Sequence, residues 1–397
     1  MDRTLYGLSK TLIRIAAITT LAAAIAHAPA AHASGSGYTS STSAGNGTTA
    51  QLNAPAGVAV DGFGNIYIAD SANHRVRKVT PLGTITTVAG NGRDGDIGDR
   101  GPATGAELVN PVGVAVDQAG NIFIADSGAG NVREVDALGI IHTVAACPAS
   151  NCTNFTPVAV AVDNQGNLFV SDYADGAVFR VDYGTTSSIS IVDDSLTSPL
   201  GLAVISSPTA GQDTLFVADS GAVYKITQAD SATPSLPTNS IALVDGAYGL
   251  GLDANGSLLV TSITTQQIFS ITDPAGTAGT AGSPTSIVDD SKSTCAPATA
   301  ACGDGGDAAS AQMNSPQGVV VNTTTGHIYI ADTLDNRVRE LTPSPNSGSG
   351  GGSGGTDTPE LGSGELLATG LATGLAVLLY RRRQARRTDR RARGSEA

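Results

Sequence analysis

The sequence predicts an all-β protein, a six-bladed β-propeller built from four-stranded antiparallel blades. The first observation is a repeat: PAGVAVDGFGNIYIAD at 55–70 returns as PVGVAVDQAGNIFIAD at 111–126. Copies of this pattern begin at Pro55, Pro111, Pro157, Pro199, Gly246 and Pro316. The second observation is that apolar residues alternate with polar ones inside each copy, which is typical of half-buried strands. Self-similarity of this kind indicates a repeat architecture, in which each copy supplies one blade.

Each copy contains four strand-like segments in the same order. In the first copy, an apolar run at 58–60 is followed by the turn residues 61–64 and a β-branched, aromatic-rich segment at 65–69. A polar loop, a third segment at 75–79, the turn at 81–83 and a fourth segment at 84–88 complete the unit. Four antiparallel strands are the content of one propeller blade.

The two ends of the repeat region predict how the ring closes. The sixth copy stops after its third strand at Leu341, and a Gly/Ser-rich stretch follows. At the other end, residues 38–47 resemble the fourth strand and exit loop at 86–92. We therefore expect the N-terminal strand to complete the last blade, which leaves no unprotected sheet edge.

These motifs resemble the NHL-repeat family, whose members form six-bladed propellers. The resemblance covers roughly residues 38–341, and it is carried by ADSANHRV at 69–76, ADTLDNRV at 331–338 and the inter-blade segment 88–111. The fifth copy departs from the pattern, because it has VTS at 260–262 in place of the Ala-Asp pair. The family includes enzymes, receptor ectodomains and scaffolds, so the resemblance implies a fold rather than a chemistry.

The N-terminus predicts export. Residues 1–33 have a basic start, an apolar core and an Ala-His-Ala cleavage site at 31–33, as a secretory signal peptide does. The propeller is then expected at 34–342, within a bacterial cell envelope or at its surface. An uncleaved N-terminal anchor is the alternative interpretation.

The C-terminus predicts a stalk, a span and a basic tail. Residues 343–360 are rich in Gly and Ser, 361–380 are mostly apolar and long enough for one transmembrane helix, and 381–397 are Arg-rich and expected to stay cytoplasmic. The order of a short motif, a span and an Arg cluster resembles a PEP-CTERM sorting signal, although Leu361 replaces the second proline. A plain membrane anchor remains the alternative.

Cysteines and charge add two constraints. Cys147 and Cys152 lie in one predicted inter-blade loop and Cys295 and Cys302 in another, so two local disulfides are the natural pairing in an exported protein. Residues 34–365 contain 32 acidic and 11 basic residues, a formal charge of −21 (11 minus 32). Such a surface repels phosphate backbones, so we expect no nucleic-acid partner.

One end of the propeller is the better place for a binding site. We call it the long-loop face, because the second-to-third strand loops and the inter-blade connections share it and binding residues concentrate on such loops. An aspartate ends the second strand on this face in five copies, at Asp70, Asp126, Asp172, Asp219 and Asp332. These carboxylates are candidate ligand-binding residues around the channel, able to hold a cation such as Ca²⁺. The competing interpretation is that each one caps its own loop as an Asx turn.

The sequence contains no strong motif for a metal site or a catalytic nucleophile. Asp94, Asp96 and Asp99 lack the spacing of a calcium loop and are expected to be a solvated acidic segment. The histidines that follow the signal peptide are His74, His142 and His327, which belong to different predicted elements, and there is no G-x-S-x-G nucleophile motif. We therefore expect no catalytic residue, no metal site and no resident cofactor.

The sequence thus favours a monomeric, surface-displayed, non-catalytic propeller that binds a protein or other envelope ligand through its long-loop face. The alternative is a metal-dependent lactonase- or lyase-like enzyme, because other six-bladed propellers hold a cation in the channel. A purely structural envelope protein is a third hypothesis.

Overall fold

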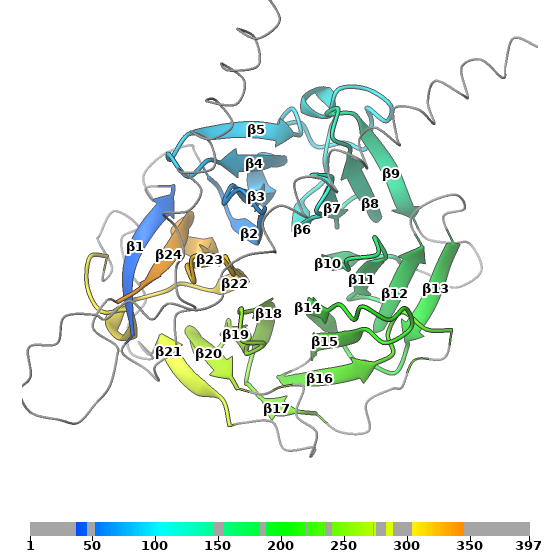
Figure 1. The fold of residues 1–397 in the computed structure, drawn as a ribbon. Helices are drawn as coiled ribbons and strands as arrows, with labels where there is room; N and C mark the ends of the chain where they lie inside the picture. The colour runs from blue at the N-terminus through cyan, green and yellow to red at the C-terminus, as the bar shows by residue number, and fades with distance from the viewer. Residues whose placement is uncertain are drawn as a thin grey trace, which may run out of the picture. The chain divides into compact units, whose positions relative to one another are not determined.

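The computed structural model describes residues 37–45, 52–146, 154–182, 188–219, 221–232, 234, 240–272, 274, 283–288 and 304–344. All of them belong to the unit formed by residues 1–348. They form six four-stranded antiparallel sheets arranged as blades around a central channel (Figure 1). The predicted all-β six-bladed propeller is therefore confirmed.

Each of the first three blades consists of four strands that are consecutive in the sequence. Their strands, from the channel outward, are β2 (Pro55–Val60), β3 (Ile66–Asp70), β4 (Arg75–Val79) and β5 (Ile85–Ala89); β6 (Pro111–Val116), β7 (Ile122–Asp126), β8 (Asn131–Val135) and β9 (Ile141–Ala146); and β10 (Pro157–Val162), β11 (Leu168–Asp172), β12 (Ala177–Asp182) and β13 (Ser188–Asp193). Short 3-10 helices η1 (Ser71–Asn73) and η2 (Ala103–Gly105) lie in the connections.

The last three blades keep the same order except at the closure. Their strands are β14 (Pro199–Ile205), β15 (Thr214–Asp219), β16 (Ala222–Thr227) and β17 (Ala242–Leu243); β18 (Ala247–Leu252), β19 (Leu258–Ser262), β20 (Gln267–Ile271) and β21 (Thr285–Val288); and β22 (Pro316–Val321), β23 (Ile328–Asp332), β24 (Arg337–Pro343) and the N-terminal β1 (Tyr38–Ala44). The helices η3 (Ala308–Ser310) and η4 (Thr333–Asp335) flank the sixth blade's inner strands.

In four of the six blades, one aspartate holds the tight turn between the first and second strands. Asp61 Oδ1 accepts the backbone N–H groups of Phe63 and Asn65, both at 2.9 Å, and its Oδ2 accepts the Asn65 side-chain amide at 2.7 Å. Asp117, Asp163 and Asp253 occupy the same position in their blades and accept backbone N–H groups in the same way. Aspartate favours such turns because its side chain satisfies the backbone locally, so these residues stabilise the turns.

The first strands pack side by side around the channel, in the order β2, β6, β10, β14, β18, β22 and back to β2. The third position is glycine in five of these six strands and Ala159 in β10, and these small residues permit the close approach. A methyl group on Gly57 would lie 2.4 Å from the Val112 carbonyl oxygen, and one on Gly318 would lie 2.5 Å from the Ala56 carbonyl oxygen. The ring therefore depends on small residues where the strands meet.

Hydroxyl groups at the ends of the second strands join neighbouring blades. Ser71 Oγ donates to the Pro111 carbonyl at 2.6 Å, and Thr333 Oγ1 donates to the Pro55 carbonyl at 2.8 Å. Ser171 makes the same bond to the Leu200 carbonyl at 2.6 Å. Each bond satisfies a buried carbonyl of the next blade, which would be costly to leave unpaired.

The N-terminal strand closes the ring as the sequence predicts. β1 pairs antiparallel with β24, from Tyr38 opposite Pro343 to Thr42 opposite Arg339, with an irregularity before Ala44. Figure 1 shows β1 as the outer strand of the blade that also contains β24, β23 and β22. The two ends of the repeat region therefore form one sheet.

Two groups of predictions lie outside the described residues. The four cysteines belong to segments that the structure does not describe, as do the signal peptide, most of the stalk, the apolar segment 361–380 and the Arg-rich tail. Within the part of the chain that is described, no helix has the length and apolar character needed to cross a membrane.

Candidate functional site

The channel contains a small cavity lined almost wholly by aliphatic side chains. Its volume is about 90 Å³. All six first strands contribute to it, through Ala56, Gly57, Val58, Val112, Gly113, Val114, Val158, Ala159, Val160, Leu200, Gly201, Leu202, Tyr248, Gly249, Leu250, Gly318 and Val319. No carboxylate or imidazole occurs among these lining residues, and the described residues contain no group of three acidic, His or Cys side chains suited to a metal ion.

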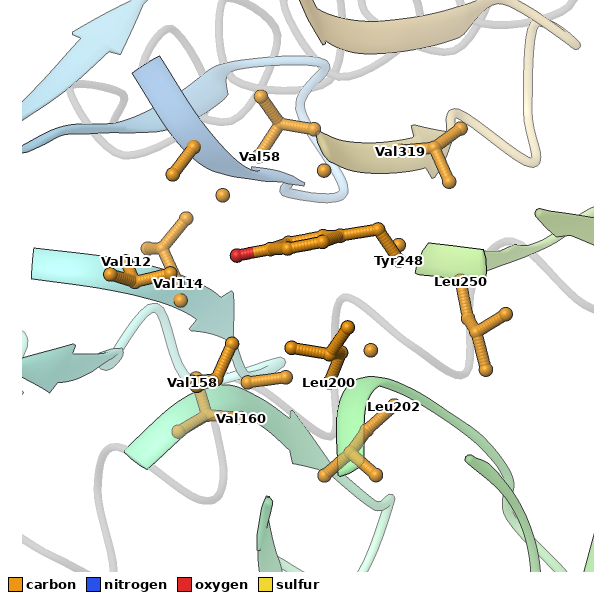
Figure 2. A pocket seen from close by; sticks show the side chains of 17 residues that line it. Val58, Val112, Val114, Val158, Val160, Leu200, Leu202, Tyr248, Leu250 and Val319 are labelled. Carbon is orange, nitrogen blue, oxygen red and sulfur yellow. The ribbon is translucent and has the colours of Figure 1, made fainter. Parts of the chain in front are cut away.

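Tyr248 is the one lining side chain that can donate a hydrogen bond. It is the second residue of β18, so it lies near the end of the channel that opens on the long-loop face. Figure 2 shows its ring extending across the channel, with the hydroxyl directed toward Val112 and Val114. Burial raises the pKa of this hydroxyl to about 12, with a smaller contribution from Tyr173. The phenol is therefore protonated at neutral pH and available as a donor.

Reasoning from the sequence missed Tyr248. The equivalent position in the other first strands is Ala56, Val112, Val158, Leu200 and Gln317. A tyrosine in this series marks a departure from the repeat, and that departure is the signal by which it could have been singled out. Tyr173, in the loop between β11 and β12 on the same face, is about half exposed.

The five predicted aspartates are buried at the ends of the second strands. Asp70, Asp126, Asp172, Asp219 and Asp332 are at most 4% exposed, and none of them lines the described cavity. Each accepts a backbone N–H from the segment that leads into the first strand of its own blade. The donors are Asn53 at 2.7 Å, Val109 at 2.7 Å, Thr156 at 3.0 Å, Ser198 at 2.6 Å and Asn314 at 2.7 Å, respectively.

This bonding differs from the expected Asx turn. Asp172 also accepts backbone N–H groups of its own loop, from Ala174 at 3.2 Å and Asp175 at 3.4 Å, and Asp70 accepts the side-chain amide of Asn73 in its own loop at 2.9 and 3.0 Å. In the four other than Asp172, the carboxylate joins the end of the second strand to a segment 17 to 22 residues earlier in the chain. In the fifth blade, Ser262 replaces the aspartate, and its hydroxyl donates to the Asp245 carbonyl at 2.5 Å.

Burial makes several of these carboxyl groups unusually weak acids. It raises the pKa of Asp126 and of Asp332 to about 7, and it raises the pKa of Asp70 and Asp172 as well. One oxygen of Asp126, Asp172 and Asp332 has no hydrogen-bond partner among the described atoms. Asp213, buried near Asp163 and Asp230, also has its pKa raised to about 7, mainly by burial. Desolvation of the charged form is the common cause.

We expect the melting temperature to rise by about 3 °C or more when the pH is lowered from 8 to 5.5. An unfolded aspartate has a pKa near ~3.9, whereas Asp126, Asp213 and Asp332 have values raised to about 7 in the folded chain. The folded state therefore binds protons in this window that the unfolded state does not. The resulting stabilisation is present at acid pH and is lost as the pH rises through about 7.

The double variant Asp126→Asn/Asp332→Asn separates this effect from the general loss of negative charge at low pH. It should flatten much of the pH dependence in differential scanning calorimetry, because both groups become neutral at every pH. Asp194→Asn, at an exposed position, is the matched control and should leave the slope unchanged. A melting temperature that falls on acidification would contradict the argument.

The acidic loop before the second blade is not simply solvated, which corrects the sequence-based expectation. The buried guanidinium of Arg133 binds Asp96 Oδ1 at 3.0 Å and Asp99 Oδ1 at 2.6 Å. The sixth blade repeats the arrangement, since Arg339 binds Asp304 Oδ1 at 3.2 Å. Asp96 and Asp99 therefore neutralise a buried cation and fix their loop on β8. Arg at the third position of β4, β8 and β24 was the available sequence signal for this role.

The three histidines lie apart, as expected. His74 follows η1 in a left-handed conformation with φ 54°, His142 is on β9, and His327 precedes β23. His327 Nδ1 lies 2.6 Å from Glu340 Oε1, and this contact lowers the pKa of Glu340. His142 Nε2 lies 3.8 Å from Asp136 Oδ2. Within the described part of the chain, these three histidines therefore lie in three different blades.

The fold and the channel define a six-bladed β-propeller with a largely aliphatic central cavity. The family profile described as the Teneurin NHL domain matches residues 91–148 and 186–341, and the NHL repeat profile matches residues 52–79. The first of these matches covers more than half of the 397 residues. The chain belongs to the Teneurin NHL domain family of NHL-repeat propellers, which confirms the NHL-repeat resemblance.

The chain is also similar to one curated protein and to several solved structures. Protein SUPPRESSOR OF QUENCHING 1, chloroplastic, from Arabidopsis thaliana, is 36% identical over 93 residues, which is 23% of this chain. The match spans only 9% of that protein's length. Among solved structures, one described as a gluconolactonase aligns with a TM-score of 0.55 at 13% identity, covering 77% of this chain and 92% of its own. A gluconolactonase from Xanthomonas campestris aligns with a TM-score of 0.51 at 15% identity, covering 74% and 87%. At these identities the structures share the fold alone.

Proposed function

We propose that this protein is a surface-displayed, non-catalytic propeller that binds a protein or other envelope ligand through its long-loop face. One observation carries the proposal: the channel behind this face is lined by aliphatic side chains and one tyrosine. The acidic residues that could have formed a polar centre there are buried, accept backbone hydrogen bonds and do not line the cavity. Apolar concave surfaces with few polar groups are typical of binding sites.

The loops of the long-loop face support the same proposal. Ile97, Tyr173 and Leu334 lie in three of these loops and are 63%, 48% and 60% exposed. The loop that carries Ile97 is fixed by the contacts of Arg133 with Asp96 and Asp99, and η4 carries Leu334. Exposed apolar side chains on loops held by a rigid scaffold are a common basis for recognition.

We also propose a cellular location for the protein. The signal peptide at 1–33 supports export, and the segments at 361–380 and 381–397 support attachment to the membrane or sorting to the envelope. We propose that the propeller acts there as a monomer and without a resident cofactor. The charge of −21 (11 minus 32) over residues 34–365 supports a partner other than nucleic acid.

A metal-dependent lactonase- or lyase-like activity is the competing proposal, and two gluconolactonases share the fold. A metal ion needs several oxygen, nitrogen or sulfur ligands in one place. The described channel lining supplies the Tyr248 hydroxyl and backbone atoms instead. The residue chemistry of the channel therefore favours binding over metal-assisted hydrolysis.

The deciding experiment compares the two proposals on the full-length protein. We expect dialysis against a chelator to leave the melting temperature unchanged, and glucono-1,5-lactone to be hydrolysed no faster with the protein than without it. Labelled protein should bind isolated envelope material saturably, and a Tyr173→Asp variant should bind more weakly. A stoichiometric channel metal, or turnover that the chelator abolishes, would overturn the proposal.

A further inference from the structure

The hydroxyl of Tyr248 stands out among the polar groups of the inner ring. The hydroxyls of Ser71, Ser171 and Thr333 each donate to a carbonyl of the next blade. For Tyr248, no described residue accepts or donates a hydrogen bond at the hydroxyl, and burial is the main cause of its raised pKa. The Tyr248 side chain is only partly buried, so its O–H can donate to a group that enters the channel.

The surroundings of this hydroxyl define what the partner can be. The ring crosses the channel, and Val58, Val112 and Val114 border the space that its hydroxyl faces (Figure 2). No charged side chain is present in the lining to balance an ion. A charged group would lose its hydration there without compensation, so a neutral group is favoured.

The size of the cavity adds a limit. Its volume of about 90 Å³ is smaller than the roughly ~150 Å³ cavity that can hold a benzene molecule. A branched aliphatic group of about three or four carbons fits this space, and the walls offer valine, leucine and alanine side chains for it to contact. The mouth faces the long loops, so the group can enter from that side.

We propose that the channel mouth binds a small, neutral, branched aliphatic group whose hydrogen-bond acceptor is recognised by the Tyr248 hydroxyl. This inference rests on the proposed binding function of the long-loop face and specifies its central contact. The acceptor is a carbonyl or similar neutral oxygen. The group is either a free small molecule or part of a macromolecular partner that binds the long-loop face.

Isobutyramide is a suitable probe, because it combines an isopropyl group with a neutral carbonyl. Ligand-observed NMR on the full-length protein should detect binding with a Kd on the order of 1 mM, as expected for so small a ligand. Isobutyrate and isobutylammonium provide charged comparisons of similar size. Tighter binding of either one than of isobutyramide would overturn the inference.

Two variants test the geometry. Tyr248→Phe keeps the ring and removes the hydroxyl, so it should weaken isobutyramide binding about three- to tenfold. Val112→Phe should abolish binding by filling the space that the hydroxyl faces. Equal affinity in Tyr248→Phe would overturn the role of the hydroxyl, and equal affinity in Val112→Phe would place the ligand elsewhere. Unchanged melting temperatures show that both variants are folded.

The same variants separate this inference from the broader proposal. If Val112→Phe also loses binding to envelope material, the aliphatic group belongs to a macromolecular partner. If it loses only isobutyramide, the natural ligand is a free small molecule. If isobutyramide does not bind but envelope material does, the channel inference fails and the long-loop face proposal stands. If neither binds, both fail.

Discussion

Deletion of residues 38–43 should cause the largest loss of stability of any small change in the propeller. These residues form most of β1, which supplies the outer strand of the sixth blade. Tyr38 and Ser40 are buried there, and the Arg339 guanidinium donates to Ser40 Oγ at 2.9 Å. We expect the free energy of unfolding to fall by at least about 4 kcal/mol, because a whole strand and its buried contacts are lost.

The deletion should also cause self-association. Without β1, the edge of β24 is left unpaired, and such an edge can pair with another chain. Thermal unfolding and size-exclusion chromatography measure the two effects. The matched control removes six residues of the Gly/Ser-rich segment, 347–352, and should change neither. A deletion variant as stable and monomeric as the parent would show that β1 is not required for closure.

The second large effect is expected at the ring of glycines around the channel. A Cβ on Gly249 would lie 2.1 Å from the Gln317 carbonyl oxygen and 3.0 Å from Thr261 Oγ1. That same hydroxyl donates to the Gln317 carbonyl at 2.5 Å and accepts the Gly249 N–H at 2.7 Å. We expect Gly249→Val to lower the free energy of unfolding by about 3 kcal/mol, because two blades must move apart.

Two comparisons check the reason for this loss. Gly62→Val is the control, because a Cβ on Gly62 would have no neighbouring atom within 4 Å, and its effect should stay within about 1 kcal/mol. The third blade has Ala159 at the ring position, so Gly249→Ala should be less harmful than Gly249→Val. Chemical denaturation measures all three. Equal effects of the two valine variants would mean that crowding between blades is not the cause.

The sequence alone determined the architecture. The period-two strand pattern is encoded within a few residues, and its recurrence at six positions sets the number of blades. The missing fourth strand at the C-terminal end and the extra strand-like segment at 38–47 were sufficient to predict the closure. The structure confirmed these features because each depends on local patterns that a linear reading can detect.

The candidate site could be predicted from the sequence only in part. The long-loop face and its loops followed from the strand order, but the sequence did not show that the five aspartates are buried and do not line the described cavity. Their donors, such as Val109 for Asp126, are about 17 residues away, and no local motif connects the two. The loop acids Asp96 and Asp99 were likewise paired with Arg133 by packing rather than by proximity in sequence.

Only the tertiary structure decided what occupies the channel. Tyr248 is one strand residue among many in the sequence, and its neighbours in the cavity, Val58, Val112 and Val114, come from blades far away in the chain. Closure of the ring brings them together around the phenol. Propeller geometry therefore builds the site from residues that are distant in the sequence. The pattern that forms each blade, by contrast, is local and recurs in every repeat.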